Sequence, residues 1–220
     1  MNGADTNQIK EDLAFFGKIN ASISHELKNI LAIISEAAGL LNDLTEMAAT
    51  GKDVDPEMLK TCSQDIIDEI QRGFTTIRQM NIFSHSADDP AKEVNPTDCL
   101  KLMIGLAGFL SVACQIRFDP PKTDIPMVYT NPFRLQNLIY QTLVFAFKSV
   151  GPEGAITVSL HSEKGDAARI HFSGLGSEPL RLFPYERASM VAGSINAEFQ
   201  IDDNNQTIDI MVPQLEKAMH

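Results

Sequence analysis

The stretch "SISHELKNIL" at residues 22–31 gathers side chains that suit chemistry on a phosphoryl group. An exposed imidazole held on a rigid helix, as we expect for His25, can accept a phosphoryl group on nitrogen. Glu26 follows directly, and a neighbouring carboxylate can take a proton from the ring or orient it. Lys28 can offset phosphoryl charge, and Asn29, one helical turn beyond His25, can orient a water or a phosphoryl oxygen. The alternative interpretation is an ordinary exposed histidine without a chemical role.

A long helix must position these side chains, because a heptad repeat extends over residues 8–48. One seam position holds Leu13, Asn20, Leu27, Ile34 and Leu41, and the other holds Phe16, Ile23, Ile30, Ala37 and Leu44. Apolar residues at this period are typical of helices in bundles and coiled coils. Within the repeat His25 falls at the position farthest from the seam, so we expect it to face solvent.

A second helix is predicted over residues 56–86, with one apolar face. This face comprises Leu59, Ile66, Ile70, Ile77 and Met80. Gly51 can end the first helix, while Asp55 before Pro56 is typical of a helix start. Two such helices form an antiparallel hairpin that cannot bury both of its apolar faces alone. We therefore expect a second copy of the chain to complete a four-helix bundle.

The remainder of the chain alternates helical and strand patterns after a predicted linker at residues 86–96. Helices are predicted over residues 97–112, 131–149 and 184–193. Strands are predicted at "QIRF", "MVYT", "AITVSLHS", "ARIHFSG", "SINAEFQID" and "QTIDIMVP". The expected fold class is α+β, with a helical hairpin domain at residues 1–88 and an α/β sandwich domain at residues 89–220, built on a mostly antiparallel sheet.

Composition argues against several classes of function. The 220 residues carry a net charge of −11 with an isoelectric point near 4.8, whereas binding to nucleic acids or anionic membranes requires basic surfaces. Three widely spaced cysteines fit a reducing compartment, and no Cys/His spacing indicates zinc. No apolar run approaches the roughly 18–20 residues that span a bilayer, and the polar N-terminus does not resemble a signal peptide. We expect a cytoplasmic protein without a metal.

The segment "SHELKNIL" resembles the H-box of sensor histidine kinases, which reads His, Glu, an apolar residue, Lys or Arg, Asn or Thr, and then Pro. The match covers residues 25–29 and departs at Ile30, where the family has Pro. The resemblance implies that His25 carries the phosphoryl group and that Glu26 is its acid/base neighbour. It also implies that Asn29 is the position used when such proteins dephosphorylate a response regulator. In that family the corresponding domain is a long helical hairpin that dimerises.

Residues 130–149 resemble the N-box helix of the ATP-binding domain in the same family. The matching residues are Asn131, Pro132, Arg134, Leu135, Ala146 and Lys148. The two characteristic asparagines are absent, because their positions hold Gln141 and Phe145. In the family the second of them coordinates the Mg²⁺ that bridges the ATP phosphates, and a phenyl ring offers no oxygen ligand. The resemblance thus implies a nucleotide-binding helix without its metal ligand.

The segment "IHFSGLG" resembles the strand and loop of the family's Asp-x-Gly-x-Gly motif. Gly174 and Gly176 match, but Phe172 replaces the Asp that accepts a hydrogen bond from adenine. No further glycine-rich loop follows to hold phosphates. The resemblance therefore implies a Bergerat-type ATPase fold that is degenerate and binds no nucleotide.

The combination is similar to bacterial histidine phosphotransferases of the ChpT type, in which a histidine-kinase-like hairpin precedes a degenerate ATPase-like domain. The similarity implies a homodimer that shuttles phosphoryl groups between response-regulator receiver domains through His25, with no cofactor. The predicted receiver-binding surface around His25 includes Ala21, Ala32, Ile33 and Glu36. Two alternatives stay open: a response-regulator phosphatase or atypical histidine kinase, and a non-catalytic dimeric regulator of a kinase.

Overall fold

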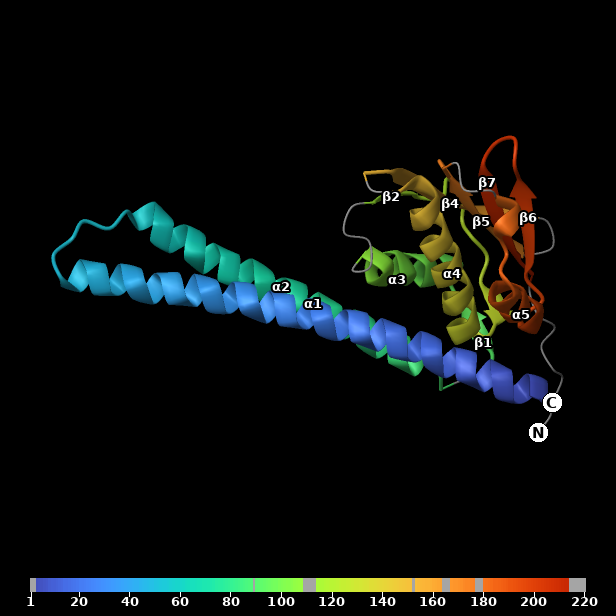
Figure 1. Ribbon diagram of the computed structural model, residues 1–220, viewed down its shortest axis with the longest axis horizontal. Helices are drawn as coiled ribbons and strands as arrows, with labels where there is room; N and C mark the ends of the chain where they lie inside the picture. Colours follow the sequence, from blue (N-terminus) through green and yellow to red (C-terminus); the bar gives the residue numbers. More distant parts are fainter. Residues whose placement is uncertain are drawn as a thin grey trace. The chain divides into compact units, whose positions relative to one another are not determined.

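The computed structural model describes residues 3–88, 90–108, 114–151, 153–163, 167–176 and 180–213. Two long helices, α1 (Gly3–Ala49) and α2 (Pro56–His85), begin the chain (Figure 1). Gly51, at φ 77°, follows the first helix, and Asp55 Oδ1 accepts the backbone N–H of Glu57 at 2.9 Å to start the second. The two predicted helices and the residues predicted to separate them are confirmed.

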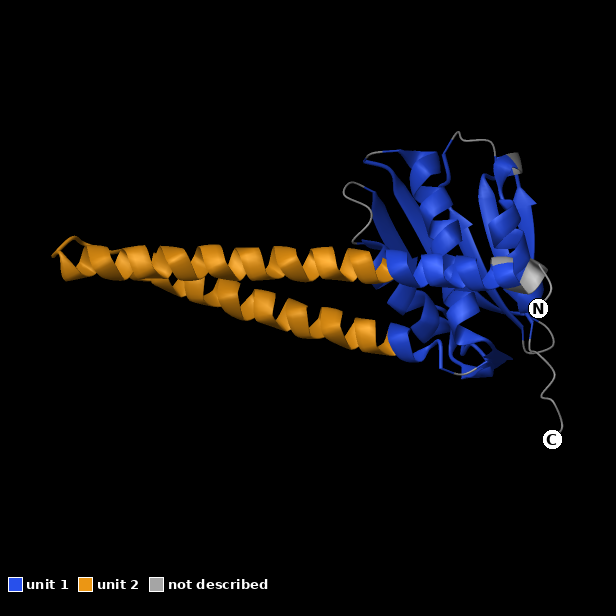
Figure 2. Ribbon diagram, turned by 60° about the horizontal axis from the view of Figure 1, so that its bottom comes forward, with its two compact units in different colours: residues 1–18, 83–220 blue, residues 19–82 orange. Residues whose placement is uncertain are grey.

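The chain divides into two compact units (Figure 2). The hairpin unit comprises residues 19–82, and the sheet unit comprises residues 1–18 with residues 83–220. The first turns of α1 thus belong with the sheet unit, in which Phe15 packs on Phe83 and Phe133 at ring-centroid distances of 5.4 and 5.2 Å. The domain boundary at residues 88 and 89 stays a prediction.

The hairpin unit has a narrow buried spine where the antiparallel helices meet. Its buried residues are Ile19, Ile23, Glu26, Ile30 and Leu44 on α1, with Cys62 and Thr76 on α2. The face predicted for the second helix is only partly right, because Ile70 and Ile77 are 40% and 41% exposed. The reason is that α2 carries apolar side chains on two adjacent faces, of which α1 covers one.

The sheet unit contains a five-stranded mixed sheet in the order β2-β4-β5-β7-β6. The strands are β2 (Gln115–Asp119), β4 (Ala155–Glu163), β5 (Ala167–Ser173), β6 (Glu198–Asp202) and β7 (Thr207–Val212). β2 pairs with β4 in parallel, and the other neighbouring pairs are antiparallel, which confirms the predicted, mostly antiparallel sheet. Alternate residues of β4, β5 and β7 are buried, so one face of the sheet forms the core.

Helices supply the other half of this core and confirm the α+β class. They are α3 (Pro96–Gly108), α4 (Pro132–Val150), the short 3₁₀ helix η1 (Leu180–Leu182) and α5 (Glu186–Ser194). α4 is the most buried of them, and it packs against α3, α5 and β4. Asn131 caps it, since its side chain accepts the backbone N–H of Arg134 at 2.9 Å.

The predicted linker at residues 86–96 is wrong as a description of the structure. It contains β1 (Lys92–Val94), which pairs antiparallel with β3 (Val128–Thr130). Ser86, at its start, is buried and donates to Gln136 Oε1 at 2.8 Å. Three residues are too short a strand for alternation to be visible in the sequence. Over the described ranges, no helix is both long and apolar enough to cross a membrane.

Candidate functional site

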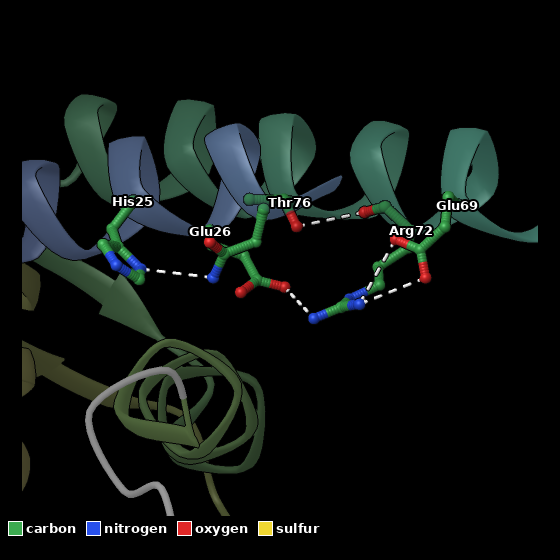
Figure 3. A network of polar contacts seen from close by, with 6 residues as sticks. His25, Glu26, Glu69, Arg72 and Thr76 are labelled. Atoms are coloured by element: carbon green, nitrogen blue, oxygen red, sulfur yellow. Dashed lines mark hydrogen bonds and ion pairs between the residues drawn. The ribbon is translucent and has the colours of Figure 1, made fainter. Parts of the chain in front are cut away.

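His25 lies on the exposed side of α1 in the hairpin unit, as predicted (Figure 3). Its ring nitrogen Nδ1 is 3.2 Å from Nδ2 of Asn29, one helical turn away. The spacing i, i+4 places the two side chains on one face, which was also predicted. Uninterrupted helix on both sides fixes where the imidazole can point, so the ring is both accessible and positioned.

Glu26, the predicted acid/base neighbour, is 5% exposed and directed into the hairpin. Its carboxylate forms an ion pair with the guanidinium of Arg72 on α2, which also donates to both carboxylate oxygens of Glu69 at 3.2 Å (Figure 3). Burial alone would lower the pKa of Arg72, but the two carboxylates outweigh it and raise the pKa above its usual value. Thr76 donates to the backbone carbonyl of Arg72 at 3.0 Å. The ion pair between Glu26 and Arg72 joins the two helices beside His25, and the other contacts hold Arg72 within α2.

The other residues predicted around His25 are accessible. Lys28, Ala21, Ala32, Ile33 and Glu36 are all exposed on α1. They form a mixed surface next to the imidazole, with small and charged side chains and the apolar Ile33. Their contribution to partner binding stays a prediction.

A row of exposed apolar side chains occupies a different face of the hairpin unit. On α2, Ile67, Ile70, Phe74 and Ile77 are 49%, 40%, 64% and 41% exposed. Their spacing of three and four residues places them on one face. On α1, Leu31 is 62% exposed and lies between the half-buried Leu27 and Ile34 on the heptad seam. We call Ile67, Ile70, Phe74 and Ile77 on α2, together with Leu31 on α1, the apolar stripe. These side chains stay exposed in the hairpin unit.

In the sheet unit, Phe145, Phe172 and Gln141 occupy the positions that the sequence resemblance aligns with nucleotide-contacting residues of the kinase family. Phe145 on α4 is 2% exposed, and its ring packs on Phe183 at 4.9 Å and on Tyr185 at 5.9 Å between centroids. Phe172 on β5 is fully buried. Gln141 donates to the side-chain oxygen of Asn137 at 3.0 Å. The phenyl rings of Phe145 and Phe172 offer no oxygen ligand to Mg²⁺, whereas Gln141 retains an amide oxygen.

Both glycines of the Gly-Leu-Gly segment have a packing role of their own. Gly174 has φ +76°, and a Cβ there would meet the carbonyl oxygen of Ala155 at 3.0 Å. At Gly176 an added Cβ would lie 1.9 Å from the carbonyl oxygen of Ser149, at the end of α4. The backbone N–H of Gly176 also donates to Ser149 Oγ at 3.2 Å. Close backbone packing therefore explains these glycines without a bound phosphate.

A cleft of about 210 Å³ lies beside α4 within the sheet unit. It is lined by Glu11, Ala14, Phe15, Lys18, Asn137, Tyr140, Gln141, Val144, Lys148, Tyr185 and Arg187. The first turns of α1 form one wall, and Arg187 on α5 closes it through an ion pair with Glu11 at 2.9 Å. The side of α4 that carries Gln141 thus faces the first turns of α1 across this cleft. The described residues contain no group of three or more metal-ligating side chains.

Sequence reasoning did not identify Arg72, Glu69 or Thr76 as part of the His25 region. Arg72 lies 46 residues from Glu26 in the chain, so no local spacing links them. The signal available in the sequence was that each helix has a polar residue among the buried positions of the spine. It becomes informative only once the register of the two helices is known.

No family model and no curated protein matches the chain. Solved structures of histidine kinases are similar to it. The catalytic domain of the histidine kinase ThkA is 14% identical, with a TM-score of 0.46 over 56% of this chain and 96% of that one. The Acinetobacter baumannii histidine kinase AdeS is 9% identical, with a TM-score of 0.45 over 81% and 95%. ThkA in complex with the response regulator TrrA is 15% identical, with a TM-score of 0.47 over 100% and 69%.

Proposed function

We propose that the protein is a histidine phosphotransfer protein of a bacterial two-component phosphorelay. This proposal is supported by a contrast between the surroundings of His25 and those of Phe145 and Phe172. An exposed, helix-borne His25 is held by Asn29, while Phe145 and Phe172 occupy the positions that would bind ATP. An exposed imidazole can exchange phosphoryl groups with a partner, and a filled pocket cannot supply them from nucleotide.

Phosphoryl transfer between receiver domains requires few groups from this chain. His25 attacks the phosphorus of an aspartyl phosphate on one receiver domain, the P–O bond breaks, and the receiver's aspartate leaves as a carboxylate. The reverse reaction passes the group to a second receiver. Each receiver brings its own Mg²⁺ and aspartate, so this protein contributes position and the positive charge of Lys28. Ala21, Ala32, Ile33 and Glu36 form the docking surface around the imidazole.

Incubation with a phosphorylated receiver domain tests the proposal. Wild type should gain an acid-labile, alkali-stable phosphoryl group, and His25→Ala should gain none. The matched control is His85→Ala, which removes another exposed histidine at the end of α2 and should label like wild type. Equal labelling of wild type and His25→Ala would refute a relay through this residue. Micromolar binding of Mg²⁺-ATP in calorimetry would refute the claim that the chain works without nucleotide.

We further propose that a second copy of the chain covers the apolar stripe. Phe74 is 64% exposed and Leu31 62%, and such rows on both helices need a partner with the same pattern. Two hairpins related by a two-fold axis would place like residues together and complete a four-helix bundle. His25 lies on another face and stays accessible in that dimer.

Sedimentation over a range of concentrations tests the dimer. Replacing Ile70 and Ile77 together by Asp should weaken self-association by about 100-fold or more, since charges would be buried at the centre of the interface. Leu40→Asp is the matched control, because Leu40 is 42% exposed on the face of Asn29. A wild-type monomer at all concentrations, or equal weakening by Leu40→Asp, would contradict the assigned interface.

A response-regulator phosphatase is the second candidate, and the exposed amide of Asn29 beside His25 favours it. An amide at this place can orient a water towards a receiver's aspartyl phosphate. Phosphate release that persists in His25→Ala and stops in Asn29→Ala would identify this activity. A non-catalytic regulator would show neither labelling nor release.

A further inference from the structure

The two polar neighbours of His25 are engaged in different ways. Glu26 is 5% exposed and paired with Arg72, which in turn binds Glu69. A buried carboxylate that left its cation would become an uncompensated charge. The ion pair therefore keeps Glu26 turned towards α2 and away from the imidazole, as Figure 3 shows.

Asn29 contacts the ring itself, with its amide 3.2 Å from His25 Nδ1. An amide has a donor end and an acceptor end of nearly the same shape. Its Nδ2–H can donate to a bare Nδ1, and after the amide turns over its Oδ1 can accept from Nδ1–H. In both forms Nδ1 is occupied, which leaves Nε2 as the nitrogen that a partner can reach.

We propose that Asn29, rather than Glu26, is the positioning residue of His25, and that Nε2 exchanges the phosphoryl group; this rests on the proposed function. With Oδ1 accepting from Nδ1–H, the lone pair of Nε2 attacks phosphorus. The bond to the receiver's aspartyl oxygen breaks, and its electrons stay on the carboxylate. The proton on Nδ1 remains on the ring throughout, so the transfer needs no general base and Glu26 can remain in its ion pair.

The tautomer of His25 in the free protein provides a test that does not depend on activity. Long-range ¹H–¹⁵N NMR at neutral pH reports which ring nitrogen carries the proton. The carboxylate of Asn29→Asp can only accept hydrogen bonds, so the ring proton of neutral His25 should reside on Nδ1 in this variant. In Asn29→Ala, the ratio of the two ring tautomers should be that of an unrestrained imidazole. Glu26→Gln should keep the wild-type ratio. So should Asn42→Ala, which removes another i, i+4 amide contact on α1, to Glu46 at 3.1 Å. A ratio that responds to Glu26→Gln and not to Asn29→Asp would overturn the assignment.

The phosphorylated protein provides the second test. The phosphoryl group should reside on Nε2, and Asn29→Ala should slow its uptake from a receiver about tenfold, as expected for one lost hydrogen bond to a developing cation. A phosphoryl group on Nδ1 would overturn the positioning role. If wild type takes up no phosphoryl group at all, the proposed function fails, while the tautomer measurement still decides whether Asn29 holds the ring.

Discussion

Ten of the fifteen large apolar side chains that are exposed in the described structure lie in the hairpin unit, residues 19–82. The sheet unit is more than twice as long and has five of them. In the hairpin unit the spine between the helices even includes the charged Glu26 and the polar Thr76. In the sheet unit one face of the sheet and three α-helices enclose a continuous apolar core, into which Phe145 and Phe172 are fitted.

The difference indicates a division of labour between the units. The hairpin unit leaves both an apolar stripe and a reactive polar face uncovered, so its surfaces are available to other molecules. In the sheet unit Phe145 and Phe172 are buried, and such closely packed side chains contribute to its stability. Chemistry, on this view, belongs to the hairpin unit, and the sheet unit is a folded support.

The largest effect is expected from placing an acid at the buried position of Phe172. Phe172→Asp removes a fully buried ring and places a carboxylate in its position, between Val158 and Ile208 of the neighbouring strands. The loss of the buried ring and the dehydration of the new carboxylate should lower the free energy of unfolding by about 5 kcal/mol or more. We expect the sheet unit to unfold as a result. Denaturant unfolding followed by far-UV circular dichroism measures this. Leu182→Asp is the control, because that side chain is 53% exposed and its replacement should change stability little. A stable Phe172→Asp variant that binds ATP would show that the pocket is not closed.

A smaller loss is expected at the glycine that allows the pocket's loop to pack on α4. Gly176→Ala forces a methyl group against the carbonyl of Ser149, with an unrelaxed separation of 1.9 Å. The backbone shift should lower the free energy of unfolding by about 3 kcal/mol. Gly193→Ala is the matched control within α5, where an added Cβ meets nothing within 4 Å. It should stabilise by up to about 1 kcal/mol. Equal effects at both positions would contradict a packing role for Gly176.

Much of the fold could be predicted from the sequence because its signals are local. The heptads predict the first long helix, Gly51 marks its end and Asp55 the start of the second, and alternation of apolar residues identifies the main strands. The exposure of His25 follows from the same heptad. The three-residue strand β1 was missed, because pairing with β3 rather than local pattern defines it.

The partners of the site residues could not be predicted in this way. Whether Glu26 serves His25 or Arg72 depends on the register between α1 and α2, which joins residues far apart in the chain. Apolar side chains lie on two adjacent faces of α2, and the more strongly apolar row of Ile67, Ile70, Phe74 and Ile77 is not the one that α1 covers, so apolar content alone would have selected the wrong face. The positions Phe145 and Phe172 could be identified only through the family resemblance, and their burial then shows why they matter.

The ion pair beside His25 should have a modest effect on stability. Glu26→Gln keeps the shape and removes the charge, while Arg72 is 46% exposed and still holds Glu69. We expect a loss of about 1 kcal/mol in the free energy of unfolding. Glu57→Gln, which breaks an exposed pair with Lys60 at 3.8 Å, should have almost no effect. If Glu26→Gln were as silent as Glu57→Gln, the contacts of Glu26 would not stabilise the hairpin unit.

The smallest effect concerns a histidine of the sheet unit that contrasts with His25. His161 lies on the open face of the sheet, and burial, then the charges of Arg169 and His171, lower its pKa below 6.5, although Asp209 and Glu163 act in the opposite direction. Well above pH 6.5 the ring is neutral in both folded and unfolded chains, so it does not affect stability. As the pH falls below 6.5 the unfolded chain binds this proton first, and the folded state loses a little stability.

An NMR titration of the His161 ring should therefore have its midpoint below 6.5. Arg169→Gln removes one of the nearby positive charges, so the pKa of His161 should rise towards its ordinary value. A wild-type midpoint at or above 6.5, or one that Arg169→Gln leaves in place, would contradict the cationic surroundings. Burial and nearby positive charges thus lower the pKa of His161, whereas the ring of His25 contacts the neutral amide of Asn29 on the same helix.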